Sequence, residues 1–176
     1  MYADTMNHTR GGTIFSEEQY FTGTFAWPAV LVAAAGAWAV FIYQIWEPTV
    51  FVRTSDKVGA WVLLLTVGIL LPWLFRYLHL TCTLTSDHIE IDFRPLMRTT
   101  IMLADIEQCE ARTYRPIREY GGWGIRRGGR GSLAYNVSGN RGVQLELKNR
   151  KRVLLGSQRA DEFAQAIRTA AGLQNR

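Results

Sequence analysis

Two long apolar runs without a charged residue constrain this chain more than any other feature. The first, FAWPAVLVAAAGAWAVFIYQIW (Phe25–Trp46), has 22 residues, and the second, VGAWVLLLTVGILLPWLF (Val58–Phe75), has 18. At about 1.5 Å per helical residue the first is roughly 33 Å long, and a hydrocarbon core of roughly 30 Å needs about that length. The second run reaches it if Tyr77–Leu80 extends the helix while Arg76 snorkels to the headgroups. The pattern predicts a transmembrane helical hairpin with the loop Glu47–Lys57.

Two buried core helices of a soluble protein are the alternative interpretation of these runs. A chain of 176 residues has little polypeptide left to cover two such helices on all sides. Four tryptophans also lie near the ends of the runs, where amphipathic rings favour the membrane interface: Trp27, Trp46, Trp61 and Trp73. We therefore expect the hairpin to contact the lipid bilayer.

The segment before the first run contains an apparent helix start. Ser16 and Gln19 have the spacing of a capping box, and Phe15 can pack on Tyr20. We expect a short interfacial helix here that bends into the first span at Pro28. The first run is too long for the apolar core of a cleavable signal peptide, and we expect it to be retained.

Within the spans, small residues predict where the two helices approach each other. Ala33–Ala37 offers a small surface that Gly59 and Gly68 of the second span can face. Small residues that are merely tolerated in lipid are the alternative. Pro72 predicts a kink in the second span.

After the second run the apolar spacing changes to a period of two, which is typical of strands. Seven strands followed by a C-terminal helix at Arg159–Ala171 are predicted. The expected strands are 80–85, 89–93, 99–103, 105–113, 133–137, 143–147 and 152–155. On the helix, Phe163 and Ile167 lie four residues apart on the apolar face, and we expect them to plug a small antiparallel barrel.

These elements give a fold class of a membrane α-helical hairpin plus an α+β domain. The predicted boundaries are 1–24 for the lead-in, 25–46 for the first span, 47–57 for the loop, 58–80 for the second span, 81–172 for the strand domain and 173–176 for the tail.

Three stretches carry a family resemblance. They are YRPIREYGGWGIR (Tyr114–Arg126), AYNVSGNRGVQLEL (Ala134–Leu147) and LLGSQRADEFAQAI (Leu154–Ile167). Behind two spans, they resemble bacterial membrane-anchored proteins with a pleckstrin-homology-like (PH-like) domain, over about Phe15 to Ala171. The resemblance implies a seven-stranded antiparallel barrel capped by a C-terminal helix, and a place in the bacterial inner membrane. It implies architecture and location rather than chemistry.

The first hairpin of the strand domain departs from the phosphoinositide-binding members of the PH fold. Those members use basic residues around this turn, whereas here it reads Thr85-Ser86-Asp87-His88. We therefore do not expect phosphoinositide recognition of that kind.

Orientation follows from the distribution of basic residues. The loop contributes Arg53 and Lys57, whereas the opposite side has Arg10, Arg76 and Arg94 near the spans. The positive-inside rule then predicts two passes with both termini in the cytoplasm.

The arginine-rich segment, Arg112–Gly131, is the candidate site. It contains six arginines, six glycines and a single acid, Glu119. Glycine-rich backbone can approach an anion closely, and guanidinium groups bind phosphate or carboxylate oxygens. We expect it to bind anionic lipid headgroups or a protein partner through these residues: Arg112, Arg115, Arg118, Trp123, Arg126, Arg127 and Arg130. Alternatively, Trp123 and its flanking glycines are a structural loop.

No catalytic set of side chains is apparent. Glu90 and Asp92 alternate along one strand, where solvation is the ordinary role, and Ser138 and Ser157 precede turns or helices. Cys82 and Cys109 lack metal-ligand spacing and are expected to be buried free thiols. We expect no cofactor, no metal, no nucleic acid and no enzymatic activity.

Two functions follow from this pattern. The first is a non-catalytic binding or scaffold module at the cytoplasmic face, which recognises a protein partner or assembles with itself. The second is an anionic-phospholipid sensor or an accessory subunit of a membrane enzyme complex.

Overall fold

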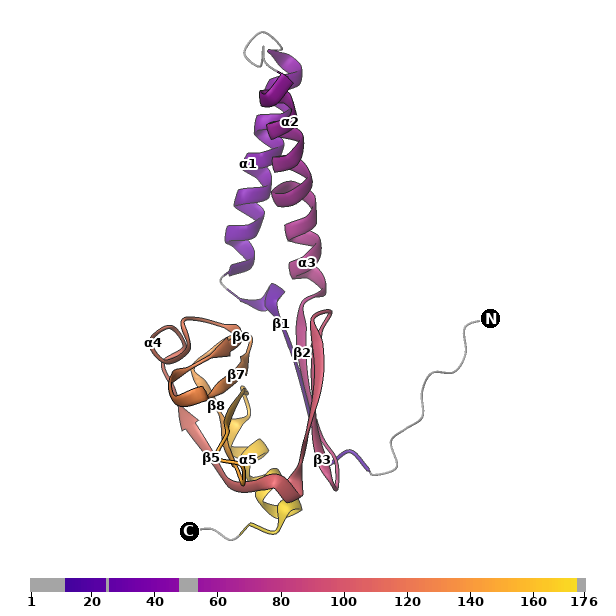
Figure 1. Cartoon of the computed structure of the whole chain (residues 1–176). Coiled ribbons are helices and arrows are strands. Elements are labelled where there is room, and N and C mark those ends of the chain that lie inside the picture. The colour runs from indigo at the N-terminus through magenta and orange to yellow at the C-terminus, as the bar shows by residue number, and fades with distance from the viewer. Residues whose placement is uncertain (1–11, 25, 48–53, 174–176) are drawn as a thin grey trace, which may run out of the picture. The chain divides into compact units, whose positions relative to one another are not determined.

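The computed structural model describes residues 12–24, 26–47 and 54–173 of the chain. These residues divide into two units (Figure 1). The hairpin unit is Tyr20–Leu78, and the strand unit joins the residues up to Gln19 with those from His79 onward. The strand unit is therefore discontinuous in sequence, and Phe15–Gln19 belongs with the strands rather than with the predicted lead-in.

The hairpin unit contains two long apolar helical segments. A 3-10 turn, η1 (Phe21–Gly23), precedes α1 (Ala26–Trp46). The second segment runs without interruption through α2 (Thr54–Leu63), the π-helix η2 (Leu64–Leu70) and α3 (Leu71–Tyr77). Both are long and apolar enough to cross a membrane, and 17% of the most apolar stretch of each is buried. The core helix of a soluble protein is mostly buried, whereas most of each of these segments is exposed.

Small residues line the contact between the two helical segments. Ala34 and Ala37 of α1 are buried. A Cβ atom at Gly68 of η2 would lie 3.5 Å from the Ala37 methyl group and 3.5 Å from the Trp38 ring, so the two backbones approach closely there. The predicted approach at Gly68 is confirmed. Gly59 has open space around the position of a Cβ atom, so it makes no comparable contact.

Four strands of the strand unit form one antiparallel sheet, in the order β1-β2-β3-β4 (Figure 1). Their bounds are β1 Phe15–Tyr20, β2 His79–Leu84, β3 His88–Arg94 and β4 Met97–Met102. Apolar and polar side chains alternate along β2 and β3, so Leu80 and Ile91 are buried while Thr81 and Glu90 lie on the other face. The predicted period of two is confirmed for these strands.

The predicted helix start at Ser16 is wrong, because residues 15–20 form β1. Phe15 and Gln19 are buried while Ser16 and Glu18 are exposed, which is strand rather than helix periodicity. Pairing with β2 satisfies backbone groups of these residues. The conformation is therefore decided by a strand distant in the sequence and not by the local capping-box pattern.

Five strands form the second sheet, in the order β5-β8-β9-β7-β6. Their bounds are β5 Ile106–Thr113, β6 Gly124–Arg127, β7 Leu133–Asn136, β8 Arg141–Leu147 and β9 Arg152–Gly156. Three short helical elements connect strands: η3 (Leu103–Asp105), α4 (Pro116–Tyr120) and η4 (Gly129–Gly131). The pair β7–β9 is parallel, whereas the other pairs of this sheet are antiparallel.

The predicted seven-stranded antiparallel barrel needs correction on three points. The described residues contain nine strands, one strand pair is parallel, and the two sheets are not closed into a barrel. β1 and β6 are the added strands. β6 is only four residues long and begins with a glycine, so it has no strand pattern that sequence alone would reveal.

The C-terminal helix α5 (Ala160–Ala171) buries its apolar face in the strand unit. Phe163 and Ile167 are both fully buried, as predicted. The ring of Phe163 stacks on Phe15 of β1 with centroids 4.5 Å apart. Next to this stack, the Glu17 carboxylate accepts hydrogen bonds from the Ser157 hydroxyl and the Gln158 amide. The strand that leads into the hairpin is thus fixed to the start of α5.

Candidate functional site

The arginine-rich segment rests on a buried cluster formed by Tyr114, Tyr120, Ala134 and Leu154. The Tyr114 hydroxyl accepts a hydrogen bond from Asn136 Nδ2 at 2.9 Å, and Asn136 Oδ1 accepts one from the Gly124 amide at 2.9 Å. Asn136 is fully buried. The segment is therefore held to a buried sheet residue, Asn136, at two points, Tyr114 near its start and Gly124 in its second half.

The helix α4 has start and stop signals that can be read in the sequence. Pro116 occupies its first turn, where a missing N–H costs nothing, and Gly121 follows its end in the left-handed conformation with φ 73°. The Gly121 and Gly122 amides donate to the Ile117 and Pro116 carbonyls. Pro116 and Tyr120 are buried, which fixes the side of α4 that faces outward.

Two of the predicted site residues, Arg112 and Trp123, make hydrogen bonds that hold the segment in place. Arg112 Nη2 lies 2.8 Å from Glu119 Oε2, and Arg112 Nε donates to Gln144 Oε1 at 3.2 Å. Trp123 is partly buried, and its Nε1 donates to the Gly139 carbonyl at 3.0 Å. Both side chains therefore support the conformation of the segment.

The Glu119 carboxylate is the only acid of the segment, and each of its two oxygens accepts a hydrogen bond from within the segment. Besides the Arg112 contact, its Oε1 accepts a hydrogen bond from the Arg115 amide at 2.6 Å. Burial alone would raise the pKa of Glu119, but the hydrogen bonds from Arg112 and from the Arg115 amide outweigh it and hold the pKa below its usual value.

The remaining arginines differ in their engagement. Arg126 is exposed, and its Nε donates to the Trp123 carbonyl at 2.9 Å. Arg115, Arg118 and Arg127 are exposed, and within the part of the chain that the structure describes their side chains have no ion pair or hydrogen bond. The Arg130 side chain lies outside the described residues. Three guanidinium groups of the segment are thus available to an external anion.

Ile117 is a residue of this surface that the sequence analysis did not select. It is 70% exposed, the highest value among the large apolar side chains of the described strand unit. It lies on α4 between Arg115 and Arg118. Two features of the sequence could have revealed it. Pro116 and Gly121 mark the start and the end of a short helix, and within that helix Ile117 is flanked by basic residues.

A polar recess of about 260 Å³ lies on the exposed face of the first sheet. Its lining includes Glu90 and Asp92, which the sequence placed on one polar face. Asp92 Oδ2 accepts hydrogen bonds from Arg94 at 2.8 Å and from Arg98 at 2.7 Å, and Arg98 Nε lies 3.1 Å from Glu90. Burial opposes ionisation of Asp92, yet the two guanidinium groups keep its pKa below the usual value. A carboxylate held in this way is a weak base, and we assign it a structural role.

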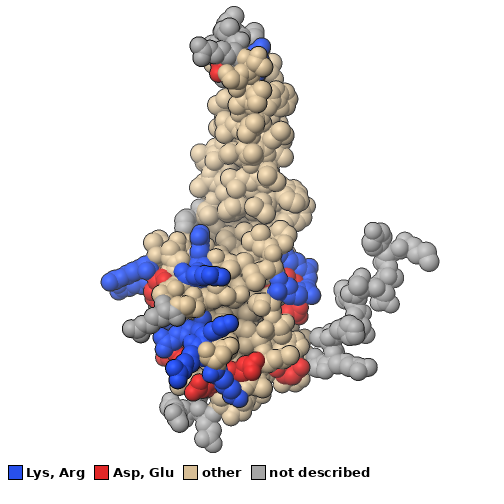
Figure 2. Space-filling view, in the orientation of Figure 1, with Lys and Arg blue, Asp and Glu red and all other residues tan. Residues whose placement is uncertain are grey.

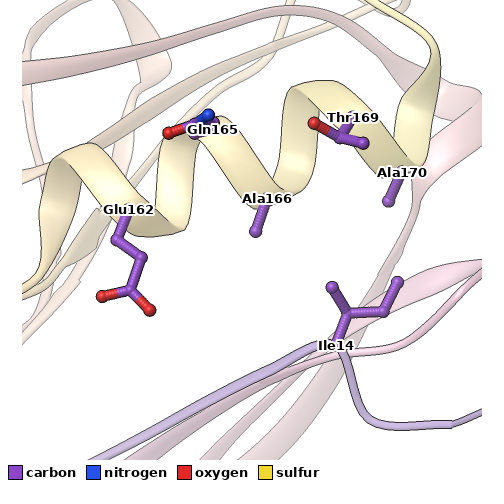
Figure 3. A pocket seen from close by; sticks show the side chains of 6 residues that line it. All are labelled: Ile14, Glu162, Gln165, Ala166, Thr169 and Ala170. Atoms are coloured by element: carbon purple, nitrogen blue, oxygen red, sulfur yellow. The ribbon is translucent and has the colours of Figure 1, made fainter.

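An apolar groove of about 300 Å³ lies between Ile14 and the outer face of α5 (Figure 3). Ala166 and Ala170 point toward Ile14 across it, Thr169 also lines it, and Glu162 lies at one end. Glu162 is paired with Arg159. The groove is lined mainly by methyl groups and provides a surface for packing rather than for chemistry.

Both cysteines are free and buried, as predicted. Burial raises the pKa of the Cys82 thiol and of the Cys109 thiol to about 12. Thiols of this kind are poor nucleophiles at neutral pH. Among the described residues there is no group of three His, Cys, Asp or Glu side chains placed to hold a metal ion.

Charged side chains are distributed unevenly over the molecule. Figure 2 shows Lys and Arg side chains gathered on the strand unit, while the long surface of the hairpin unit carries almost none.

Comparison with protein families, with curated proteins and with solved structures finds no match for this chain.

Proposed function

We propose that this protein is a membrane-anchored, non-catalytic binding module. The hairpin unit crosses the bacterial inner membrane twice, and the strand unit lies in the cytoplasm with both termini. The arginine-rich segment is the surface that binds an anionic partner.

The observation that carries this proposal is the pairing of β1 with β2. The strand before the hairpin and the strand after it are neighbours in one sheet. Because adjacent strands must lie on the same side of a membrane, both ends of the hairpin return to one compartment. The two apolar helical segments between them have the length of two passes.

A PH-like fold for the strand unit is part of this proposal. Two sheets are followed in sequence by one C-terminal helix whose apolar face is buried. The parallel pair β7–β9 and the extra strands β1 and β6 are departures from a seven-stranded antiparallel barrel. The resemblance of the three sequence stretches supports the assignment.

The binding role rests on the three free guanidinium groups at Arg115, Arg118 and Arg127. Guanidinium groups bind carboxylate and phosphate oxygens through paired N–H groups. The segment that holds them is fixed by Asn136 and by the Arg112–Glu119 pair, so the groups are presented without a large ordering cost.

The test is purification of the full chain in mild detergent, with the retained proteins and lipids quantified. The test variant replaces Arg115, Arg118 and Arg127 with Gln. The matched control replaces Lys148, Arg150 and Lys151 with Gln, which removes the same charge from the exposed β8–β9 turn.

The expected result is a stoichiometric anionic component that the test variant loses and the control keeps. Equal retention by both variants would contradict the assigned surface. Extraction of the chain from membranes by alkaline carbonate would contradict the anchored module itself. A stoichiometric membrane enzyme as the retained component would assign the chain as an accessory subunit, whereas self-assembly alone would assign it as a scaffold.

A further inference from the structure

Three exposed side chains, one apolar and two cationic, lie at the start of α4. Ile117 is 70% exposed and lies between Arg115 and Arg118. Since Pro116 and Tyr120 of the same short helix are buried, α4 cannot turn Ile117 inward without moving Tyr120 out of its cluster. A single exposed isoleucine is ordinary at a protein surface, but its place between two unpaired guanidinium groups is not explained by folding.

Within the described strand unit, neither Arg115 nor Arg118 forms an ion pair through its side chain. Glu119 is occupied by Arg112 and by the Arg115 backbone amide. By contrast, Arg94 and Arg98 share the Asp92 carboxylate, with Glu90 as a second partner of Arg98, and Arg141, Arg152 and Arg159 each pair with one carboxylate. The guanidinium groups of Arg115 and Arg118 therefore make no ion pair of their own and can contact an external partner, while Arg115 also helps to hold the pKa of Glu119 low from a distance.

Building on the proposed function, we propose that α4 is a lipid-contacting element. Ile117 enters the headgroup region of an anionic bilayer, and Arg115 and Arg118 bind the phosphate groups of phospholipids on either side. The short alternation of cation, apolar side chain and cation matches the chemistry of a membrane interface, where an apolar side chain enters and basic groups meet anionic headgroups.

A protein partner fits this face less well. Specific protein interfaces bury on the order of 1,200–2,000 Å² and centre on a packed apolar or aromatic anchor. The apolar part of this face is the single residue Ile117, and the nearby aromatic side chains Tyr114 and Tyr120 are buried beneath it. A contact with lipid needs only a few side chains.

The contact can be weak and still matter, because the hairpin holds the strand unit near the bilayer. One basic residue near an anionic leaflet changes partition by about fivefold, so two change it by roughly 25-fold before screening. Such a contact could not anchor a free protein. It is enough to bias the orientation of a tethered one, since tethering supplies a high effective concentration.

The experiment uses the full chain in lipid nanodiscs with a fluorescent label attached through Ile117→Cys. Both native thiols are buried and do not compete for the label. Lipids carrying a spin label near the headgroup quench the fluorophore on contact. The matched label position is Asn149→Cys in the β8–β9 turn, where Lys148 and Lys151 give a similar charge without an exposed apolar neighbour.

We expect the label at residue 117 to be quenched several-fold more in nanodiscs that contain phosphatidylglycerol than in phosphatidylcholine alone. Salt should reduce the quenching. Arg115→Gln with Arg118→Gln should reduce it as well, whereas Lys148→Gln with Lys151→Gln should leave it unchanged. The label at residue 149 should show no dependence on lipid charge.

Equal quenching in neutral and anionic nanodiscs, or none in either, would overturn the lipid assignment. So would cross-linking of residue 117 to a protein while lipid fails to quench its label. These results leave the membrane anchor intact, because only failure of the chain to enter nanodiscs at all contradicts the proposed function.

Discussion

The indole Nε1 of Trp38 lies 3.3 Å from the carbonyl oxygen of Gly68, and it donates a hydrogen bond across the two helical segments of the hairpin unit. Gly68 is four residues before Pro72, which has no N–H, so the donor that a regular α-helix would supply is missing. In hydrocarbon no water can take its place. The side chain of α1 thus gives this carbonyl of the π-helix η2 a donor from the other helical segment, close to the proline that cannot supply one.

This relationship predicts a coupling between Trp38 and Pro72. Trp38→Phe should destabilise the hairpin by about 0.6–1.7 kcal/mol, the range of hydrogen bonds between membrane helices. In a Pro72→Ala background, where residue 72 regains an N–H, the same substitution should cost clearly less. Unfolding of the four proteins of this double-mutant cycle in mixed micelles measures the coupling, and additive effects would contradict the role given to Trp38.

A second prediction concerns the stack of Phe15 on Phe163. Phe163→Ala should cost about 3–5 kcal/mol, because it truncates a fully buried side chain. Phe15→Ala should show a coupling with it of about 0.5–1.5 kcal/mol, the usual excess for an aromatic pair. Thermal unfolding of the full chain in detergent measures both.

The same stack predicts the behaviour of fragments. A fragment beginning at residue 81 lacks β1 and leaves Phe163 without its partner, so it should unfold at a lower temperature than the full chain. A fragment of residues 81–176 as stable as the full chain would show that β1 does not belong to the fold of the strand unit.

Two adjacent glycines give a third prediction about the arginine-rich segment. A Cβ atom at Gly128 would lie 2.6 Å from Ser132 Oγ and 2.7 Å from the Tyr120 ring, whereas at Gly129 it would meet nothing within 4 Å. Gly128→Ala should therefore cost about 1–3 kcal/mol as an overpacked site. Gly129→Ala is the matched control and should be close to neutral. Thermal midpoints of the two variants that coincide would contradict the described packing of Tyr120.

The polar recess predicts a dependence of stability on pH. The pKa of Asp92 is lower in the folded chain than in the unfolded chain, because Arg98 and Arg94 stabilise its charge. Its contribution is therefore present above the unfolded value of about 4 and is lost as the pH falls through the lower folded pKa. Asp92→Asn should lower the thermal midpoint at pH 7, and its difference from the wild type should shrink in acid.

A second variant separates this effect from general acid unfolding. Arg98→Gln removes one of the two cations beside Asp92, so the folded pKa of Asp92 should move back toward the unfolded value, and the part of the stability that is lost in acid should be smaller than in the wild type. If Asp92→Asn and the wild type differ by the same amount at every pH, the ion pairs do not set the acid response.

The sequence was sufficient for the elements whose pattern is local. Two uncharged runs of the right length predicted α1 and the segment from α2 to α3, and period-two alternation predicted β2 and β3. The buried face of α5 followed from the spacing of Phe163 and Ile167. Each of these depends on residues a few positions apart.

The elements that sequence analysis missed depend on partners far along the chain. Residues 15–20 satisfy both a capping box and a strand pattern, and only β2, beyond the whole hairpin, decides between them. β6 is a short glycine-led strand that exists because β7 pairs with it. Closure into a barrel failed as a prediction because the order of strands within a sheet cannot be read from their order in the chain.

The candidate site divides in the same way. The sequence shows plainly that the segment is rich in arginine. It does not show that Glu119 of α4 forms its ion pair with Arg112 of β5 and not with Arg115 or Arg118, because that depends on how α4 packs near β5. That one pairing decides which cations stay free. The exposure of Ile117 follows from the burial of Tyr120, which is also a tertiary fact.

Labelling of introduced cysteines with a membrane-impermeant thiol reagent tests the anchored two-pass arrangement most directly. Ser55→Cys lies at the exposed start of α2, and Asn149→Cys lies in the β8–β9 turn. In intact bacterial cells Ser55→Cys should react, while Asn149→Cys should react only after permeabilisation. Reaction of Asn149→Cys alone would invert the proposed topology, and equal reaction of both positions in intact cells would contradict a hairpin that crosses the membrane.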